Sequence, residues 1–272
     1  MRPASMIRDR VRRHPAIADA VRAARRVRAR RRPPVPTAYG FVLQGGDRQG
    51  TSDFEPDETA LVLELLPAVD VFVDIGANVG LYSCLARSRG VQVIAVEPLR
   101  SNVELLLANL VANGWDDALV LPLALGARTT VAPMFGDGTG ASLTRGWAGV
   151  RTRRPAWVPI TTADEELLPR IGGLRSLIKV DVEGGELDLL AGAGRLLRAE
   201  PAPAWLVEVN FAQHHPEGRH PAFARVMHAF WETGYTVRTL PERRTVSAED
   251  VTRWTAQGHV DFGSHNYLCT QG

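Results

Sequence analysis

The stretch VFVDIGANVGLY, residues 71–82, decides the fold class of this chain. Three apolar residues lead into Asp74, and a turn punctuated by Gly76 and Gly80 separates this run from a second apolar stretch. A short buried strand, a tight turn with little side-chain bulk and the start of a helix account for this order. In open parallel sheets ligands bind outside the carboxyl ends of the strands, so Asp74 falls where a ligand is expected.

The pattern of strand followed by helix recurs along the chain. Helical patterns fall at about 51–67, 79–89, 99–113, 186–198 and 221–233. Apolar runs suited to buried strands lie at 71–75, 91–97, 118–125, 177–182 and 204–209, and later strands are expected at 235–240 and 265–270, as a hairpin at one sheet edge. Alternation of this kind predicts an α/β fold, a mostly parallel sheet with helices on both faces.

Composition divides the chain into an arm and a body. Residues 1–32 hold twelve arginines and two acidic residues, so the remaining residues carry a net charge of −8 within a chain of net charge +2. We expect an arginine-rich arm with a proline-rich spacer over 1–36 and one domain over 37–272, with a loop insertion at about 126–176. The arm is either solvated or docks on an acidic partner, a membrane surface or nucleic acid. Nucleic acid is disfavoured because no aromatic residue interleaves the arginines.

Targeting signals are not evident in the sequence. No run of eighteen apolar residues and no apolar signal region is present, so neither a transmembrane segment nor secretion is expected. The two cysteines, Cys84 and Cys269, are far apart and form no metal-binding or disulfide pattern. A cytoplasmic location is the resulting expectation.

The glycine turn and the next strand end predict a ribose-containing ligand. Asn78 stands where a dinucleotide-binding turn has its second glycine, which disfavours a nicotinamide or flavin dinucleotide. Asp74 would repel a diphosphate but suits a ligand with an ammonium group. Glu97 ends the strand at 91–97, seventeen residues after Gly80, where an acidic side chain accepts hydrogen bonds from ribose hydroxyls.

Several longer motifs resemble a known family. FVDIGANVGLYS, VIAVEP, LPLALG, GASL and IKVDVEGGELDLLAGA are similar to the FkbM-type family of S-adenosylmethionine-dependent methyltransferases, over about residues 55–240. The resemblance implies a Rossmann-like sheet of seven strands, mostly parallel with one antiparallel strand. It also implies S-adenosylmethionine as cofactor and a hydroxyl on a sugar, polyketide or other natural product as acceptor.

With this cofactor, each motif residue receives an expected role. Asp74 and the carbonyls near Gly76 would bind the methionine ammonium group, and Glu97 the ribose hydroxyls. Ser142 would cap a loop over the cofactor or, equally, bond only its own backbone. The other cofactor-binding candidates are Ala77, Asn78 and Gly80 in the turn, and Pro98, Asn102, Leu123 and Ala124 around adenine.

The catalytic candidates lie in IKVDVEGGE, residues 178–186. Asp181 is predicted to be the general base or a metal ligand, and Glu183 to orient the acceptor or the loop. A purely structural turn at Gly184 and Gly185 is the alternative, and Glu186 fits a first helical turn. A divalent metal such as Mg²⁺ is an option, with Asp181, Glu208 and His214 or His215 as ligands. His214 is otherwise a candidate base.

The acceptor is not encoded in these motifs. Its binding groups are expected in loops 126–176 and 211–220, where Trp147, Trp157 and the arginines at 151, 153 and 154 either stack on a sugar, bind an acidic group or form the surface of the insertion. The main prediction is O-methylation of a small-molecule or glycosylated acceptor. The alternatives are N- or C-methylation with the same cofactor, a non-catalytic adapter that binds through the arm and, more weakly, a nicotinamide enzyme.

Overall fold

The computed structural model describes residues 24, 28, 31–46, 49–150 and 152–271. Most of the predicted arginine-rich arm therefore lies outside the described residues, and its role stays a prediction. The described chain begins with a short antiparallel pair, β1 (Val35–Pro36) and β2 (Val42–Leu43). Among the described residues, no helix combines the length and the apolar character needed to cross a bilayer.

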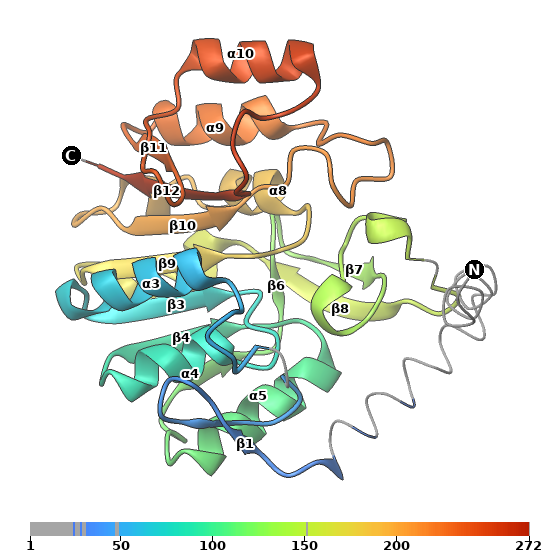
Figure 1. Ribbon diagram of the computed structural model, residues 1–272, viewed down its shortest axis with the longest axis vertical. Coiled ribbons are helices and arrows are strands. Elements are labelled where there is room, and N and C mark those ends of the chain that lie inside the picture. The colour runs from blue at the N-terminus through green and yellow to red at the C-terminus, as the bar shows by residue number, and fades with distance from the viewer. Residues whose placement is uncertain (1–23, 25–27, 29–30, 47–48, 151, 272) are drawn as a thin grey trace.

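A seven-stranded sheet forms the centre of the molecule (Figure 1). Its order is β11-β12-β10-β9-β3-β4-β5, and β12 runs antiparallel to both β10 and β11 while the other pairings are parallel. The fold class is thereby confirmed, including its one antiparallel strand. The bounds are β3 Val71–Ile75, β4 Gln92–Val96, β5 Leu119–Leu121, β9 Ser176–Val180, β10 Ala204–Glu208, β11 Thr236–Thr239 and β12 Asn266–Thr270.

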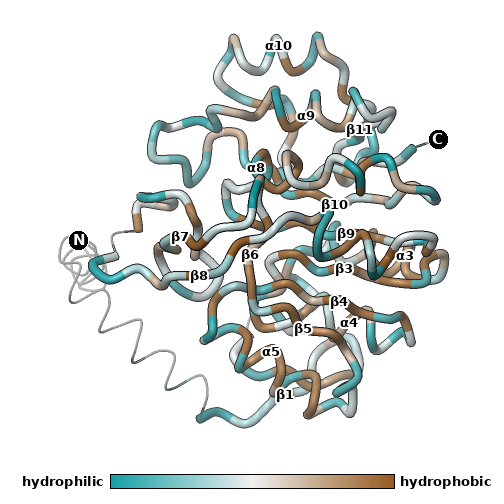
Figure 2. The backbone as a smooth tube through the Cα atoms, turned by 180° about the vertical axis from the view of Figure 1, so that it is seen from behind, coloured by the Kyte–Doolittle hydropathy of each residue, from teal (hydrophilic) through white to brown (hydrophobic). Residues whose placement is uncertain are grey.

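Helices cover both faces of this sheet, which explains why β3 is buried along its whole length. Val71 and Val73 of β3 point into one apolar cluster, whereas Phe72 points into the other. The first cluster includes α6 (Ala163–Glu166), α7 (Leu168–Ile171), α8 (Glu186–Ala191), α9 (Phe223–Trp231) and α10 (Ala248–Gln257); the second includes α3 (Pro56–Leu65), α4 (Leu81–Ser88) and α5 (Arg100–Ala112). Figure 2 shows hydrophobic residues concentrated along the central strands.

A second, three-stranded sheet is formed mainly by the segment 126–176. Its order is β6-β8-β7, with β6 Ala124–Leu125, β7 Thr130–Met134 and β8 Ala156–Thr161. Figure 1 shows β7 and β8 to one side of the large sheet. The apolar run 118–125, predicted as one strand, is divided between the two sheets. Pro122 interrupts it, and the amide of Leu123 donates to the carbonyl of Leu121 instead of to a neighbouring strand.

Other differences from prediction have local causes. The helix expected over 186–198 ends at Ala191 with Gly192 as its C-cap, and Gly192 approaches Gly126 so closely that a Cβ would lie 2.0 Å from the Gly126 carbonyl oxygen. The chain then forms short 3-10 turns, as it also does elsewhere: Leu66–Ala68, Gly138–Gly140, Trp147–Gly149 and Leu196–Arg198. Strands β11 and β12 pair, but α10 lies between them, so they are not a hairpin. Helix α10 escaped prediction although Ser247 and Asp250 form a capping box.

The order of the strands indicates at which edge of the large sheet a ligand is expected. From β3 the chain proceeds through β4 to β5 on one side, and from β9 through β10 to β12 and β11 on the other. The order therefore reverses between β3 and β9, and ligands bind at the carboxyl ends of strands at such a switch point. Asp74, Glu97, Asp181 and Glu208 lie in or directly after the last residues of β3, β4, β9 and β10.

Candidate active site

A cavity of about 450 Å³ opens at this edge of the sheet. It is lined by the ends of β3, β4, β9 and β10, by the segment before α3 and by the loop that follows β7. The predicted residues that line it are Asp74, Gly76, Ala77, Asn78, Glu97, Pro98, Asn102, Leu123, Ala124, Asp181, Glu183, Glu208 and His214. Gly80, Ser142 and His215 are not part of the lining.

The turn after β3 depends on glycine at position 76. Gly76 has a φ of +85°, and a Cβ there would lie 1.8 Å from the carbonyl oxygen of Asp181. The amide of Gly76 donates to the carbonyl of Val96 over 2.9 Å. The turn therefore touches the ends of β4 and β9, and its backbone is exposed to the cavity between them.

Asp74 is buried at the end of β3 beside this turn. Its Oδ2 accepts a hydrogen bond from the Ser83 hydroxyl over 2.6 Å, which links the strand to the first turn of α4. Burial raises the pKa of Asp74, and the charge of Lys179 and the Ser83 hydrogen bond oppose this increase. A ligand ammonium group next to Asp74 would compensate the carboxylate in the same way.

Glu97 is held in place by two backbone amides. Its Oε2 accepts from the amide of Asn78 and its Oε1 from the amide of Leu99, both over 2.9 Å. Burial nevertheless raises the pKa of Glu97 to about 7, against the lowering effect of these bonds. Glu97 also lines the cavity, and a carboxylate oxygen can accept more than one hydrogen bond, which suits the two hydroxyls of a ribose.

Asn102, Pro98 and Ala124 are the candidates for the adenine side of the site. Asn102 is buried, and its amide donates to the carbonyl of Gly138 over 3.5 Å, bringing α5 against the loop after β7. Like Asn102, Pro98 and Ala124 line the cavity. The residues present therefore fit the three chemical parts of S-adenosylmethionine: an ammonium group, a ribose and a flat apolar base.

Lys179 provides the positive charge of the other half of the cavity. The buried ammonium lies 3.3 Å from Asp181 Oδ2 and 4.6 Å from the centre of the Tyr82 ring. Burial alone would lower the pKa of Lys179, but the carboxylates of Asp181, Glu55, Asp74 and Glu208 outweigh it and raise the pKa. Glu55 in turn accepts a hydrogen bond from the Tyr82 hydroxyl over 2.7 Å.

The turn after β9 carries the second group of candidates. Glu183 has a φ of +53°, and its Oε2 accepts a hydrogen bond from Trp147 Nε1 over 2.6 Å. His214 Nδ1 lies 3.9 Å from the same oxygen. Burial, and next the charge of Asp181, raise the pKa of Glu183 to about 7, while Trp147 lowers it. Glu183 is thus poised to exchange a proton near neutral pH.

A family model decides which proteins this chain is related to. The model described as the Methyltransferase FkbM domain matches residues 74–237, more than half of the chain. The chain belongs to the FkbM methyltransferase family. The match covers both cofactor motifs and the DVEGGE turn, so the resemblance inferred from these motifs is confirmed.

Individual relatives of this FkbM chain are distant. Hexuronic acid methyltransferase AglP of Haloferax volcanii is 27% identical over 152 residues, which cover 53% of this chain and 59% of AglP. The match thus spans about three-fifths of that relative. Two solved structures are similar. Cofactor-bound Rv0187 from MTB is 14% identical, and the match covers 93% of this chain and 88% of that chain with a TM-score of 0.46. An O-methyltransferase from Bacillus cereus in complex with SAH is 13% identical, and the match covers 79% of this chain and 80% of that chain with a TM-score of 0.45.

The metal prediction requires correction. Among the described residues, no group of three or more histidine, cysteine or carboxylate side chains is arranged to hold a metal ion. His215, one proposed ligand, points elsewhere: its Nε2 lies 3.1 Å from the carbonyl oxygen of Asn210, and its ring packs edge-on against Trp147. The Lys179 ammonium lies next to Asp181 and interacts electrostatically with Glu208, so a side chain places positive charge beside two of the carboxylates that were candidate metal ligands.

Ser142 and Glu186 support the DVEGGE turn from outside the cavity. The buried Ser142 hydroxyl donates to the carbonyl of Glu183 over 2.6 Å and accepts from the amide of Thr144 over 2.9 Å. Glu186 Oε1 accepts from the amide of Gly184 over 2.8 Å, and its Oε2 lies 3.2 Å from His220 Nε2. The GASL motif therefore shapes the turn that carries Glu183, and its role towards the cofactor stays a prediction.

Three residues of the cavity were missed or undervalued in the sequence. Glu55 and Tyr82 come from the segment before α3 and from α4, and no spacing rule connects them to the FkbM motifs. Trp147 was assigned equally to a surface, but it is buried and lines the cavity, whereas Trp157 is exposed and does not. The sequence carries no signal that links Trp147 to Gly184, although in the fold a Cβ at position 184 would lie 2.6 Å from the indole ring.

Proposed function

We propose that the protein transfers the methyl group of S-adenosylmethionine to a hydroxyl group of a small-molecule or glycosylated acceptor. The observation that carries this proposal is the convergence of Asp74, Glu97 and Asp181, from three neighbouring strand ends, on one cavity beside the bare backbone of Gly76. A protein that serves only as a scaffold needs none of these carboxylates, of which Asp74 and Glu97 are buried. S-Adenosylmethionine would supply a methyl group bound to a positively charged sulfur, and the neutral thioether that remains after transfer is a good leaving group.

The cofactor half of the cavity has one group for each part of that molecule. Asp74 would bind the ammonium group and Glu97 both ribose hydroxyls, while Asn102 and Pro98 would flank adenine. Because Glu97 is oriented by two backbone amides, it loses little conformational freedom on binding. The backbone of residues 76–78 would lie directly along the bound cofactor.

The acceptor half favours Glu183 as general base over Asp181. In the reaction the acceptor oxygen forms a bond to the methyl carbon, the carbon–sulfur bond breaks, and the hydroxyl proton passes to a carboxylate. Asp181 Oδ2 is engaged by the Lys179 ammonium at 3.3 Å, so this oxygen already has a partner. Glu183, with a pKa of about 7, accepts a proton more readily and is oriented by Trp147. Asp181 would then position the acceptor.

The charges around the cavity restrict the acceptor. Asp181, Glu183 and Glu208 influence one another electrostatically, and the Lys179 charge opposes their mutual repulsion. An acceptor with its own carboxylate would face repulsion of about 1–3 kcal/mol per neighbouring charge at an effective dielectric constant near 20. We therefore favour a neutral or amine-bearing acceptor, and do not transfer the hexuronic acid in the name of AglP to this chain. The same charges support N-methylation of an amine as the second candidate.

Calorimetric titration of the full chain tests the cofactor assignment. We expect micromolar binding of S-adenosylmethionine, no binding of NAD, and a loss of about tenfold or more in affinity for Glu97→Ala. Glu242→Ala, at an exposed position far from the cavity lining, is the matched control. No binding of S-adenosylmethionine by the intact chain would refute the proposal and leave the non-catalytic adapter as the better explanation.

Mass spectrometry then tests the acceptor. Glucose, glucosamine and glucuronic acid present the same ring with a neutral group, an amine and a carboxylate. Methylation of the first two in preference to the third is expected, and fragmentation distinguishes an O-methyl from an N-methyl product. A preference for glucuronic acid would contradict the charge argument without affecting the cofactor assignment.

A further inference from the structure

One face of the small sheet is apolar and open to solvent. In the antiparallel pairing of β7 with β8, Val131 is opposite Pro159, and Pro133 is opposite Trp157. Directly opposed residues, and residues two apart in a strand, share one face of a sheet. These four side chains therefore form one surface, which we call the outer face. Trp157 is 69% exposed and Val131 is 59% exposed.

The inner face of the same two strands packs against the body of the protein. Met134, Val158 and Ile160 are buried there in an apolar cluster with Leu99 and Ala141. Met134 also lines the cavity, whereas Val131, Pro133, Trp157 and Pro159 do not. The inner face of these strands thus contributes to the cavity, and the outer face points away from it. Binding of a cofactor or an acceptor in the cavity therefore does not explain the exposed Trp157.

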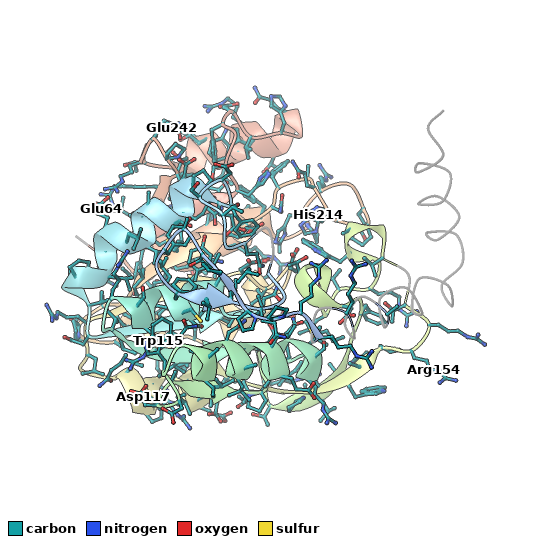
Figure 3. All side chains as sticks on the ribbon, turned by 60° about the horizontal axis from the view of Figure 1, so that its bottom comes forward. Glu64, Trp115, Asp117, Arg154, His214 and Glu242 are labelled. Carbon is teal, nitrogen blue, oxygen red and sulfur yellow. The ribbon has the colours of Figure 1, made fainter. Side chains whose placement is uncertain are left out.

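The charge around the outer face is opposite to that of the body. Residues 126–163 contain five arginines and one acidic residue. Residues 33–272 as a whole, by contrast, carry a net charge of −8. Arg128, Arg153 and Arg154 are exposed, and Figure 3 shows Arg154 extending away from the body. The acidic residues that follow β8 already have partners: Asp164 with Arg195, Glu165 with Thr129 and Thr161, and Glu166 with Arg170.

We propose that the outer face docks on a membrane surface containing anionic lipids. Tryptophan prefers the interface between headgroups and acyl chains, and flanking arginines are attracted to anionic headgroups. The twelve arginines of residues 1–32 have the same sign of charge and would add long-range attraction. This inference rests on the proposed function: the protein would act at the membrane surface, where docking would bring the cavity close to acceptors carried by lipids.

Other occupants fit the outer face less well. Nucleic acid binding relies on polar and basic contacts to phosphates, whereas the centre of this face is apolar. A second copy of the chain could extend the small sheet at β7, the edge strand that carries Val131 and Pro133. Pro133 in β7 has no amide hydrogen and interrupts the row of backbone donors that such pairing needs.

Vesicle flotation with the full chain tests the proposal. We expect binding to vesicles of phosphatidylcholine mixed with phosphatidylglycerol, and much weaker binding to phosphatidylcholine alone. The double variant Val131→Ser with Trp157→Ser should bind at least about tenfold more weakly, since both apolar side chains leave the interface. Removing Arg154 by Arg154→Gln should cost about fivefold.

The control is Val111→Ser on α5. Val111 is 63% exposed, nearly the same as Val131, but lies on another element, so this variant should float like the unchanged protein. Equal thermal unfolding of all variants ensures that only the surface has changed.

Three results would overturn the proposal. The first is no binding to the anionic vesicles. The second is unchanged binding by the double variant, which would assign membrane attraction to the arginine-rich arm alone. The third is a dimer in sedimentation analysis that the double variant abolishes, which would make the outer face a subunit interface.

Discussion

The buried carboxylate of Glu97 links the stability of the protein to its cofactor. The side chain is only 4% exposed, and burial raises its pKa from 4.5 to about 7. The folded state therefore keeps the Glu97 proton at pH values where the unfolded chain has lost it. Stability from this group is fully present below pH 4.5 and is lost as the pH rises through about 7.

The size of this effect follows from the shift. One pKa unit corresponds to about 1.4 kcal/mol, so the whole shift is worth about 3 kcal/mol, of which roughly 2–2.5 kcal/mol is lost between pH 5 and pH 8. Glu97→Gln removes the titration. It also disturbs one of the two amide hydrogen bonds, because the glutamine amide nitrogen cannot accept, but this cost does not depend on pH.

Urea unfolding at pH 5 and pH 8, without cofactor, measures the effect. The decrease in unfolding free energy from pH 5 to pH 8 should be about 2 kcal/mol smaller in Glu97→Gln than in the unchanged protein. Other buried carboxylates of the cavity contribute equally to both proteins and cancel in this difference. Glu242→Gln, at an exposed site, should leave the decrease unchanged.

Cofactor binding provides the second readout. Ribose hydroxyls donate to the charged form of Glu97, so the affinity for S-adenosylmethionine should fall below about pH 7, by up to about tenfold per pH unit. Glu97→Gln should bind more weakly and show a flatter pH dependence. The same pH dependence of stability in both proteins would refute the raised pKa of Glu97, and unchanged affinity in the variant would refute its role as ribose ligand.

Three further predictions concern the rest of the cavity. Glu183→Gln should lower kcat by about 10²–10⁴ in steady-state assays while calorimetry finds unchanged cofactor affinity, as expected for a general base. Trp147→Phe removes a hydrogen bond that lowers the pKa of Glu183, so the acidic limb of the pH–rate profile should move to higher pH. Gly76→Ala would place a Cβ against the Asp181 carbonyl and should lower the free energy of unfolding by about 3 kcal/mol or more. Gly90→Ala, which has a similar φ but open space, should cost only about 1–2 kcal/mol in the same thermal unfolding assay.

The cofactor half of the site could be predicted because its determinants are close together in the sequence. Asp74, Gly76 and Glu97 lie in a single strand–helix–strand unit, in which the end of one strand and the end of the next necessarily meet. Apolar runs at 71–75 and 91–97 indicated buried parallel strands, and the structure has strands there. The roles of these residues towards S-adenosylmethionine remain predictions that the experiments above test.

Some local signals were present but were outweighed or overlooked. The apolar run 118–125 contains Pro122, and the chain changes from one sheet to the other there. Ser247 and Asp250 begin α10 with a capping box, yet the helix is too polar to stand out by hydrophobicity. Gly192 is the C-cap of α8, and its close contact with Gly126, a residue far away in the sequence, leaves no room for a side chain there.

By itself, the sequence determined the α/β class, the alternation of strands and helices and the acidic strand ends, because strand periodicity and turn chemistry act over a few residues. Only the tertiary structure decided the acceptor half. There Glu55, Tyr82 and Trp147 reach the cavity from three separate segments, and the Lys179 ammonium lies beside Asp181, one of the candidate metal ligands. Which buried charges become partners depends on distances across the fold, and these are set by the packing of whole elements rather than by spacing along the chain.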